Sequence, residues 1–273
     1  MMGRRGLKYC SVAVLSTMVA GFSTIGICQT GEVNDANRRT NSFGLGLGLD
    51  RFGQRDQLES PYTYSGIMFA SSLSYRRRGP TDLHIVETFF SLGGINSDAL
   101  PANVAETVGM LSYSYVHKVV NAPVGAYLGG GLSSTVMSSD FKFSSTYSSW
   151  YWNHSLNLVL AADYCFGKGR SLSVELTAPV VGLISRPKNG SWLNGDNWDV
   201  MQNFLVAAGQ GVFQPFWSAP AVFASVGYTQ PVSGHLNVRG TYRFAYVASD
   251  RPAETQSLRM FMNVVLVGLE WVF

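Results

Sequence analysis

The chain has 273 residues, and only 14% of them are charged, compared with about 25% in average soluble proteins. Hydrophobic residues make up 46% and aromatic residues 13%, which excludes a disordered or collagen-like chain. The formal net charge is +3, but three of the 20 basic residues lie within the first eight positions, so the remainder is neutral. This balance excludes a nucleic-acid-binding protein of the basic type, and no nucleic-acid partner is expected.

Residues 1–28 are predicted to be a secretory signal. Basic residues come first, the segment 11–27 is mostly apolar, and a cleavage site before Gln29 follows. The interior Ser, Thr and Gly residues and the modest length argue against a retained anchoring helix. Lipidation of Cys28 stays open as an alternative, although Ile27 occupies the position where a small residue is expected.

Cysteine usage agrees with export. Cys10 and Cys28 lie in or at the edge of the signal, so Cys165 alone remains and no intramolecular disulfide is expected. No Cys/His group has the spacing of zinc ligands, and neither a metal nor another cofactor is expected. Residues 29–41 are polar and without apolar periodicity, which predicts a flexible lead-in to the domain that spans residues 42–273.

From residue 42 onwards, apolar residues alternate with small or polar ones, as in the run from Phe43 to Leu49, where glycines occupy every second position. Such alternation predicts strands with one apolar and one polar face. The expected strands are 42–50, 64–78, 81–93, 106–120, 124–134, 148–166, 170–184, 218–230, 235–247 and 257–273. Residues 200–209 could instead form a loop helix or part of an extra hairpin. The hairpin would raise the count from ten strands to twelve.

Three features favour a closed membrane barrel over a soluble sandwich. Charged residues fall on the polar face, which suits a narrow hydrated lumen: Glu87, Asp163, Glu175, Arg239, Arg243 and Glu270. Aromatic residues gather towards strand ends, as in interfacial girdles. Short connections at 79–81, 121–123, 167–169 and 231–234 alternate with long ones near 51–63, 94–105, 135–147, 186–216 and 248–256.

The carboxyl end carries the most specific motif. Apolar residues alternate up to the last position: Val265, Val267, Leu269, Trp271 and Phe273. With this ending the chain resembles bacterial outer-membrane β-barrel proteins, and the Gly-Leu repeat at 44–49 with Pro179 and Arg186-Pro187 resembles uncharacterised Bacteroidota barrels. The resemblance implies an all-β, antiparallel transmembrane barrel in the bacterial outer membrane, with both termini in the periplasm.

The resemblance also implies partners. Leu269, Trp271 and Phe273 would be the assembly signal that the barrel-assembly machinery reads, and outer-membrane lipids and lipopolysaccharide would surround the barrel. Arg76-Arg77-Arg78 adjoins a short turn, where it would mark the interface or contact anionic headgroups or a membrane or periplasmic protein partner.

No catalytic residue is predicted. His154 and Ser155 are adjacent in a strand and therefore face opposite sides, unlike the histidine and serine of acyl-hydrolysing barrels, which lie two residues apart. Asp82-Leu83-His84 matches half of the omptin-type protease pattern, but the paired acidic residues are absent and a short turn precedes it. His117 and His235 are expected at the interface and the rim.

The lumen charges are expected to pair with one another, because an unpaired charge away from bulk water is costly. A barrel of ten strands has an interior that side chains nearly fill, so an ion-pair plug is favoured over a wide channel. The preferred function is a non-enzymatic structural, partner-binding or surface-binding component. The alternatives are a narrow solute pore, and then a lipid or peptide hydrolase.

Overall fold

The computed structural model describes residues 40–57, 60–121, 124–142, 146–166, 169–186, 211–250 and 257–273. The predicted signal and nearly all of the predicted lead-in lie outside these ranges. The strands are β1 (Thr40–Asp56), β2 (Tyr64–Arg78), β3 (Asp82–Ser97), β4 (Leu100–Asn121), β5 (Val124–Lys142), β6 (Thr146–Cys165), β7 (Ser171–Ser185), β8 (Val212–Pro215), β9 (Ala221–Ser233), β10 (Leu236–Ser249) and β11 (Leu258–Val272). Within the described ranges, no helix is long and apolar enough to cross a membrane.

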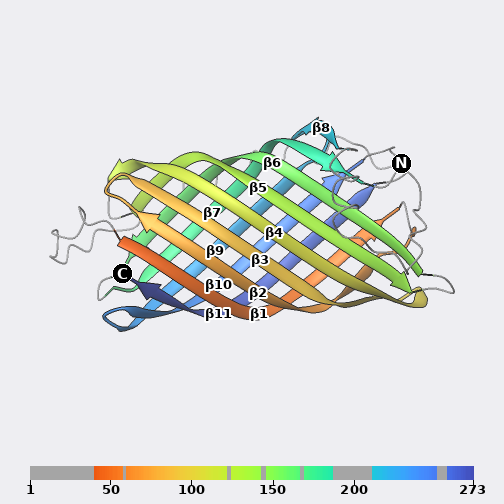
Figure 1. The fold of residues 1–273 in the computed structure, drawn as a ribbon, viewed down its shortest axis with the longest axis horizontal. Helices are drawn as coiled ribbons and strands as arrows, with labels where there is room; N and C mark the ends of the chain where they lie inside the picture. Colours follow the sequence, from red (N-terminus) through yellow and green to blue (C-terminus); the bar gives the residue numbers. More distant parts are fainter. Residues whose placement is uncertain are drawn as a thin grey trace. The chain divides into compact units, whose positions relative to one another are not determined.

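The strands close into an antiparallel barrel in which neighbours in sequence are neighbours in space (Figure 1). β1 pairs with both β2 and β11, and the pairing of β6 with β7 completes the ring. β8 and β9 act as one interrupted strand, because β8 pairs with residues 181–184 of β7 and β9 with residues 171–177. The predicted ten-stranded barrel is confirmed, while the alternative hairpin at 200–209 lies outside the described residues.

The barrel has two distinguishable ends. At the end that we call the terminal end, Ser42 at the start of β1 pairs with Val272 at the finish of β11. Asn41 and Phe273 exchange both backbone hydrogen bonds there, with N···O distances of 3.1 and 2.9 Å. Thr40 and Asn41 therefore belong to β1 rather than to the predicted lead-in. The opposite end, where β1 passes to β2, is called the loop end.

The strands extend further towards the loop end than the alternation predicts. Residues 94–105 were expected to be a long connection, but β3 runs to Ser97 and β4 begins at Leu100. Most of the expected connection 135–147 likewise belongs to β5 and β6. A strand needs about 9–11 residues to cross the hydrocarbon core, so β4, with 22 residues, is far longer than one crossing requires. Polar residues lie on both faces of these extensions, so the sequence there lacks the apolar–polar alternation from which a strand would be predicted.

Alternation sorts the side chains between the two faces of the wall as predicted. In β1, Leu45, Leu47 and Leu49 are 45–58% exposed on the outer face. The intervening glycines face the lumen, and a Cβ at Gly44, Gly46 or Gly48 would lie within 3 Å of an atom of β2 or β11. The outer face carries an apolar band around the ring, and charged residues such as Arg51 and Arg77 lie on it nearer the strand ends. The lumen side is lined mainly by polar residues in the terminal half, whereas the loop-end half combines large apolar side chains with a buried polar network, and this division positions the site described below.

Candidate functional site in the barrel lumen

The terminal half of the lumen contains a layer of charged side chains. All six charged residues that the sequence places on the polar face line lumen cavities: Glu87, Asp163, Glu175, Arg239, Arg243 and Glu270. Arg76 and Arg78 of β2 join them. The cavities in this half are therefore lined by four arginines and four carboxylates, so the layer is neutral overall.

Two ion pairs form in this layer. The Arg243 guanidinium donates to a Glu87 carboxylate oxygen across the lumen, and its Cζ lies 5.7 Å from the centre of the Phe89 ring. Nearer the terminal end, Arg78 Nη2 lies 2.5 Å from Asp163 Oδ2. Each pair joins strands that are not adjacent in the ring, so the pairs connect opposite parts of the wall.

The Arg76-Arg77-Arg78 run does not act as one basic patch. Arg76 and Arg78 point into the lumen and Arg77 lies on the outer face, because neighbours in a strand alternate sides. The expectation that the whole run marks the interface is therefore too coarse, because two of its three arginines are lumenal. The signal was available, since Arg76 and Arg78 share the parity of Ser72 and Ser74 in the same strand.

The remaining charges of the layer are not held in ion pairs. Arg239 donates to Ser173 at 2.9 Å and to Thr241 at 3.3 Å, and Glu270 accepts from Ser42 at 2.7 Å. Within the described part of the chain, Arg76 has a buried Nε without a hydrogen-bond partner. No hydrogen bond or ion pair to Glu175 occurs among these residues either.

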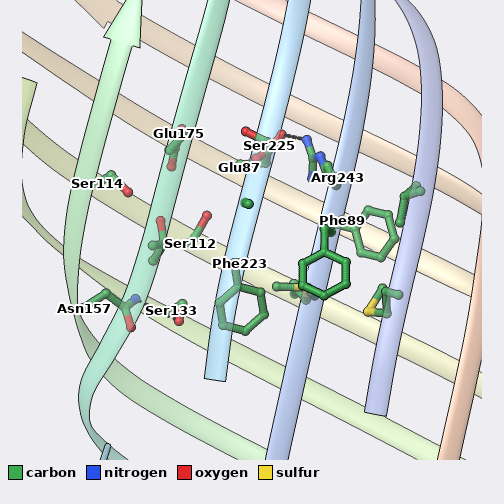
Figure 2. A pocket seen from close by; sticks show the side chains of 17 residues that line it. Glu87, Phe89, Ser112, Ser114, Ser133, Asn157, Glu175, Phe223, Ser225 and Arg243 are labelled. Carbon is green, nitrogen blue, oxygen red and sulfur yellow. Dashed lines mark hydrogen bonds and ion pairs between the residues drawn. The ribbon is translucent and has the colours of Figure 1, made fainter. Parts of the chain in front are cut away.

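A cavity of about 90 Å³ lies where the charged layer meets the apolar part of the lumen, and we call it the lumenal chamber (Figure 2). One wall carries hydroxyl and amide groups: Ser112, Ser114, Ser133, Asn157, Thr177 and Ser225. The other wall is apolar: Phe89, Met110, Phe223, Met262 and Val264. Glu87, Glu175 and Arg243 are its charged lining residues.

The chamber continues towards the terminal end through two further cavities. A narrow one of about 30 Å³ shares Glu87 and Arg243 with the chamber, and it shares Arg76 and Arg239 with a wider one of about 260 Å³. Thr40 and Val272, at the terminal end of the barrel, line the wider cavity. We call these two cavities the passage and the vestibule.

Towards the loop end, the lumen is filled by an apolar layer. Large inward-facing side chains there are almost completely buried, with exposed fractions of 0–2%: Phe52, Tyr64, Met68, Ile95, Met137, Phe141, Tyr151, Leu258, Met260 and Met262. Tyr64 and Phe141 pack edge to face with ring centroids 5.5 Å apart. Side chains from β1, β2, β3, β5, β6 and β11 thus meet across the barrel.

A second polar network lies within this loop-end half, and the sequence analysis missed it. Arg186 pairs with Asp56 at 2.5 Å, and both side chains are 2% exposed. Gln54 donates to Glu106 at 3.0 Å, and Ser91 donates to Asp50 at 3.0 Å. Asp50, Gln54 and Asp56 share the lumen parity of the glycines in β1, so extending the alternation past residue 50 would have placed them inside.

All four histidines of the chain lie outside the lumen. His154 faces outward and stacks edge-on against Trp152 at 5.9 Å, while Ser155 faces inward and bonds to Ser133 at 2.9 Å. His84 lies on the outer face beside Tyr113, with Nδ1 3.0 Å from the tyrosine oxygen. His117 is exposed on the outer face of β4, and His235 occupies the turn before β10. The described residues contain no group of three metal-ligating side chains.

The residues of the predicted assembly signal lie together at the seam between β1 and β11. Leu269, Trp271 and Phe273 all point outward, and Phe273 is 68% exposed. The Trp271 ring lies 6.4 Å from that of Phe43 on β1. β11 is paired with a strand on each side, so these three side chains form an exposed apolar row on the outer face of the barrel, and recognition of this strand by the assembly machinery stays a prediction.

These features define the fold of a bacterial outer-membrane β-barrel with a neutral polar lumen on one side and an apolar layer on the other. No protein-family model matches the sequence, and neither does any curated protein. Among solved structures, the chain is similar to the outer-membrane protease OmpT from Escherichia coli, with a TM-score of 0.52 and 9% identity over 90% of this chain and 99% of that one.

Two other solved structures are similar to the chain at lower scores. The attachment invasion locus protein Ail of Yersinia pestis has a TM-score of 0.38 and 9% identity, covering 85% of this chain and 99% of that one. The translocator domain of the autotransporter NalP from Neisseria meningitidis has a TM-score of 0.43 and 10% identity, covering 97% and 95%. At such identities the likeness to OmpT shows the fold alone.

Proposed function

We propose that this chain is an integral barrel of the bacterial outer membrane that acts by binding, as a structural, partner-binding or surface-binding component. In this proposal it neither conducts solutes through its lumen nor catalyses hydrolysis. The single observation that carries the proposal is the apolar layer in the loop-end half. Ten large side chains that are 0–2% exposed occupy the space a channel would need.

The outer face supports placement in a membrane. Apolar residues cover it, and aromatic side chains gather on it towards the terminal end: Phe43, Tyr75, Tyr115, Tyr164, Tyr228 and Trp271. We place the terminal end in the periplasm, since outer-membrane barrels have short turns on that side. The partners would then be outer-membrane lipids and lipopolysaccharide, the assembly machinery during insertion, and a protein of the membrane or periplasm.

Conductance tests the proposal. The purified barrel, reconstituted in planar bilayers, should give no single-channel steps. A variant with Phe52→Gly, Met68→Gly and Met262→Gly removes part of the apolar layer and should conduct, which shows that the assay can detect an opened lumen. A matched variant with outward Leu47→Gly and Phe69→Gly should stay silent. Regular steps from the unmodified barrel would refute the proposal and favour the narrow pore.

The hydrolase alternative has a separate test. Because no histidine reaches the lumen, and because His154 and Ser155 lie on opposite faces, these residues cannot form a nucleophile–base pair in this arrangement. The purified barrel should therefore release no fatty acid from phospholipid vesicles and no fragments from a peptide library. Turnover that disappears in His154→Ala, with the barrel still folded, would contradict this proposal.

A further inference from the structure

Only some of the charged side chains that line the cavities of the terminal half are matched in ion pairs. Of the four arginines and four carboxylates, Arg243 with Glu87 and Arg78 with Asp163 are ion pairs. The two other arginines, Arg76 and Arg239, lie in the passage and vestibule. A carboxylate without an ion-pair partner, Glu175, lies in the chamber itself.

Glu175 is the group that points to a ligand. Its carboxylate belongs to the chamber lining, close to the Glu87–Arg243 pair (Figure 2). Arg243 lines the same cavity, and Arg76 and Arg239 line the adjoining passage, yet none of these arginines lies within 4.0 Å of a Glu175 oxygen in the described structure. Glu175 is half-buried, so its carboxylate faces the cavity without a protein donor of its own among the described residues. A donor supplied by a ligand would give it a charge-assisted hydrogen bond, which is stronger than a neutral one.

The zero net charge of the lumen lining indicates which net charge a ligand should carry. A single added cation or anion would leave a net charge within a neutral lumen of half-buried charged side chains, and an uncompensated charge there is disfavoured. A molecule carrying both an ammonium and a carboxylate leaves the balance unchanged. Its ammonium can reach Glu175, while its carboxylate can reach Arg76 or Arg239 in the passage, where a guanidinium can bind it through two parallel hydrogen bonds.

The shape of the chamber selects the rest of the molecule. The wall opposite the hydroxyl groups is formed by Phe89, Phe223 and methionine side chains, which favour an apolar group. An apolar cavity of about 150 Å³ holds a benzene molecule, so the chamber, at about 90 Å³, suits a branched group of three or four carbons. From these observations we infer that the lumenal chamber binds a small zwitterion with a short apolar group, of the size of an aliphatic α-amino acid.

The chamber adjoins cavities on the terminal side, and a ligand of this size can enter from there only when side chains that line the passage of about 30 Å³ move. The vestibule, passage and chamber share lining residues in sequence, whereas the apolar layer lies beyond the chamber. The site is therefore a blind pocket, and its occupation does not require solute to cross the barrel. The inference holds whether or not the chain binds a protein partner.

Calorimetric titration of the folded barrel in detergent with three related probes tests the inference. L-Valine carries both charges and an isopropyl group. Isobutylamine lacks the carboxylate, and isovalerate lacks the ammonium. L-Valine should bind, and each analogue should bind at least about tenfold more weakly, because each leaves one charged lumen group without its partner.

Variants assign the binding to the chamber. Glu175→Gln should weaken L-valine binding by about tenfold or more, because it removes the partner of the ammonium. Arg239→Gln should reduce the preference for L-valine over isobutylamine. Glu106→Gln is the matched control: it makes the same chemical change at a residue of the loop-end half, away from the chamber, and should leave L-valine binding unchanged. Heat-modifiable gel mobility identifies the folded fraction of each variant, and affinities are expressed per folded barrel.

The remaining outcomes overturn the inference. No heat of binding with L-valine would show that the chamber holds only water. Equal affinity for isobutylamine would define a cation site, and equal affinity for isovalerate an anion site. An unchanged affinity of the Glu175→Gln variant for L-valine would show that the ligand binds elsewhere on the barrel.

Discussion

Glu87 of β3 and Arg243 of β10 form an ion pair inside the barrel, although 156 positions separate them in sequence and three strands separate them in the ring. Each side chain retains about a fifth of its exposed area, 19% and 18%. The exposure of the pair is therefore intermediate between that of a surface ion pair and that of a fully buried one. The pair connects two regions of the wall that share no backbone hydrogen bonds.

Breaking this pair on one side should cost more than removing it entirely. Glu87→Gln or Arg243→Gln alone leaves one charge unpaired in the lumen, and we expect each to lower the free energy of unfolding by roughly 1–3 kcal/mol, below the value for fully buried pairs. The double variant should recover a large part of this loss. Urea unfolding in lipid vesicles, followed by gel mobility, measures all three; strictly additive losses would show that the two groups do not interact.

A close backbone approach between β1 and β11 requires glycine at position 268. A Cβ at Gly268 would lie 2.1 Å from the carbonyl oxygen of Leu45, so Gly268→Ala forces the two strands to shift. Overpacking of this kind typically costs about 1–3 kcal/mol. Gly240→Ala is the control, because a Cβ there meets no atom within 4 Å. Equal unfolding curves for both variants would argue against tight closure at this seam.

The terminal phenylalanine should matter for assembly more than for stability. Phe273 is 68% exposed, so it packs little against the rest of the barrel. Phe273→Asp, or its deletion, should reduce the folded barrel recovered from outer membranes. The same variants should refold in detergent with nearly the yield of the unmodified chain. A parallel loss in both experiments would mean that Phe273 stabilises the fold and does not serve as a signal.

Orientation in the membrane can be read from two matched cysteines. Thr63 and Thr81 are both exposed, at the loop end and at the terminal end respectively. In a background with Cys165→Ser, Thr63→Cys should react with a membrane-impermeant maleimide on intact cells, and Thr81→Cys should react only after the outer membrane is permeabilised. The reverse pattern would place the termini outside the cell.

The period-two alternation by itself determined the fold class and the face on which most side chains lie. Leu45 faces outward and Gly46 inward, and Ser155 is separated from His154, because neighbouring residues of a strand must point to opposite sides. Closure followed as well, since strands with an apolar outer face can lie in lipid only when no edge is left unpaired.

The tertiary structure alone decided what the lumen contains. Alternation assigns a face but not a partner. It could not show that Glu87 forms an ion pair with Arg243 and Asp56 with Arg186, or that Glu175 forms none among the described residues. Nor could it reveal the apolar layer: in β11, Met260, Met262 and Val264 face the lumen while their neighbours on the outer face are largely apolar too. Where both faces of a strand are apolar, only the closure of the ring distinguishes side chains that contact one another from those that contact lipid.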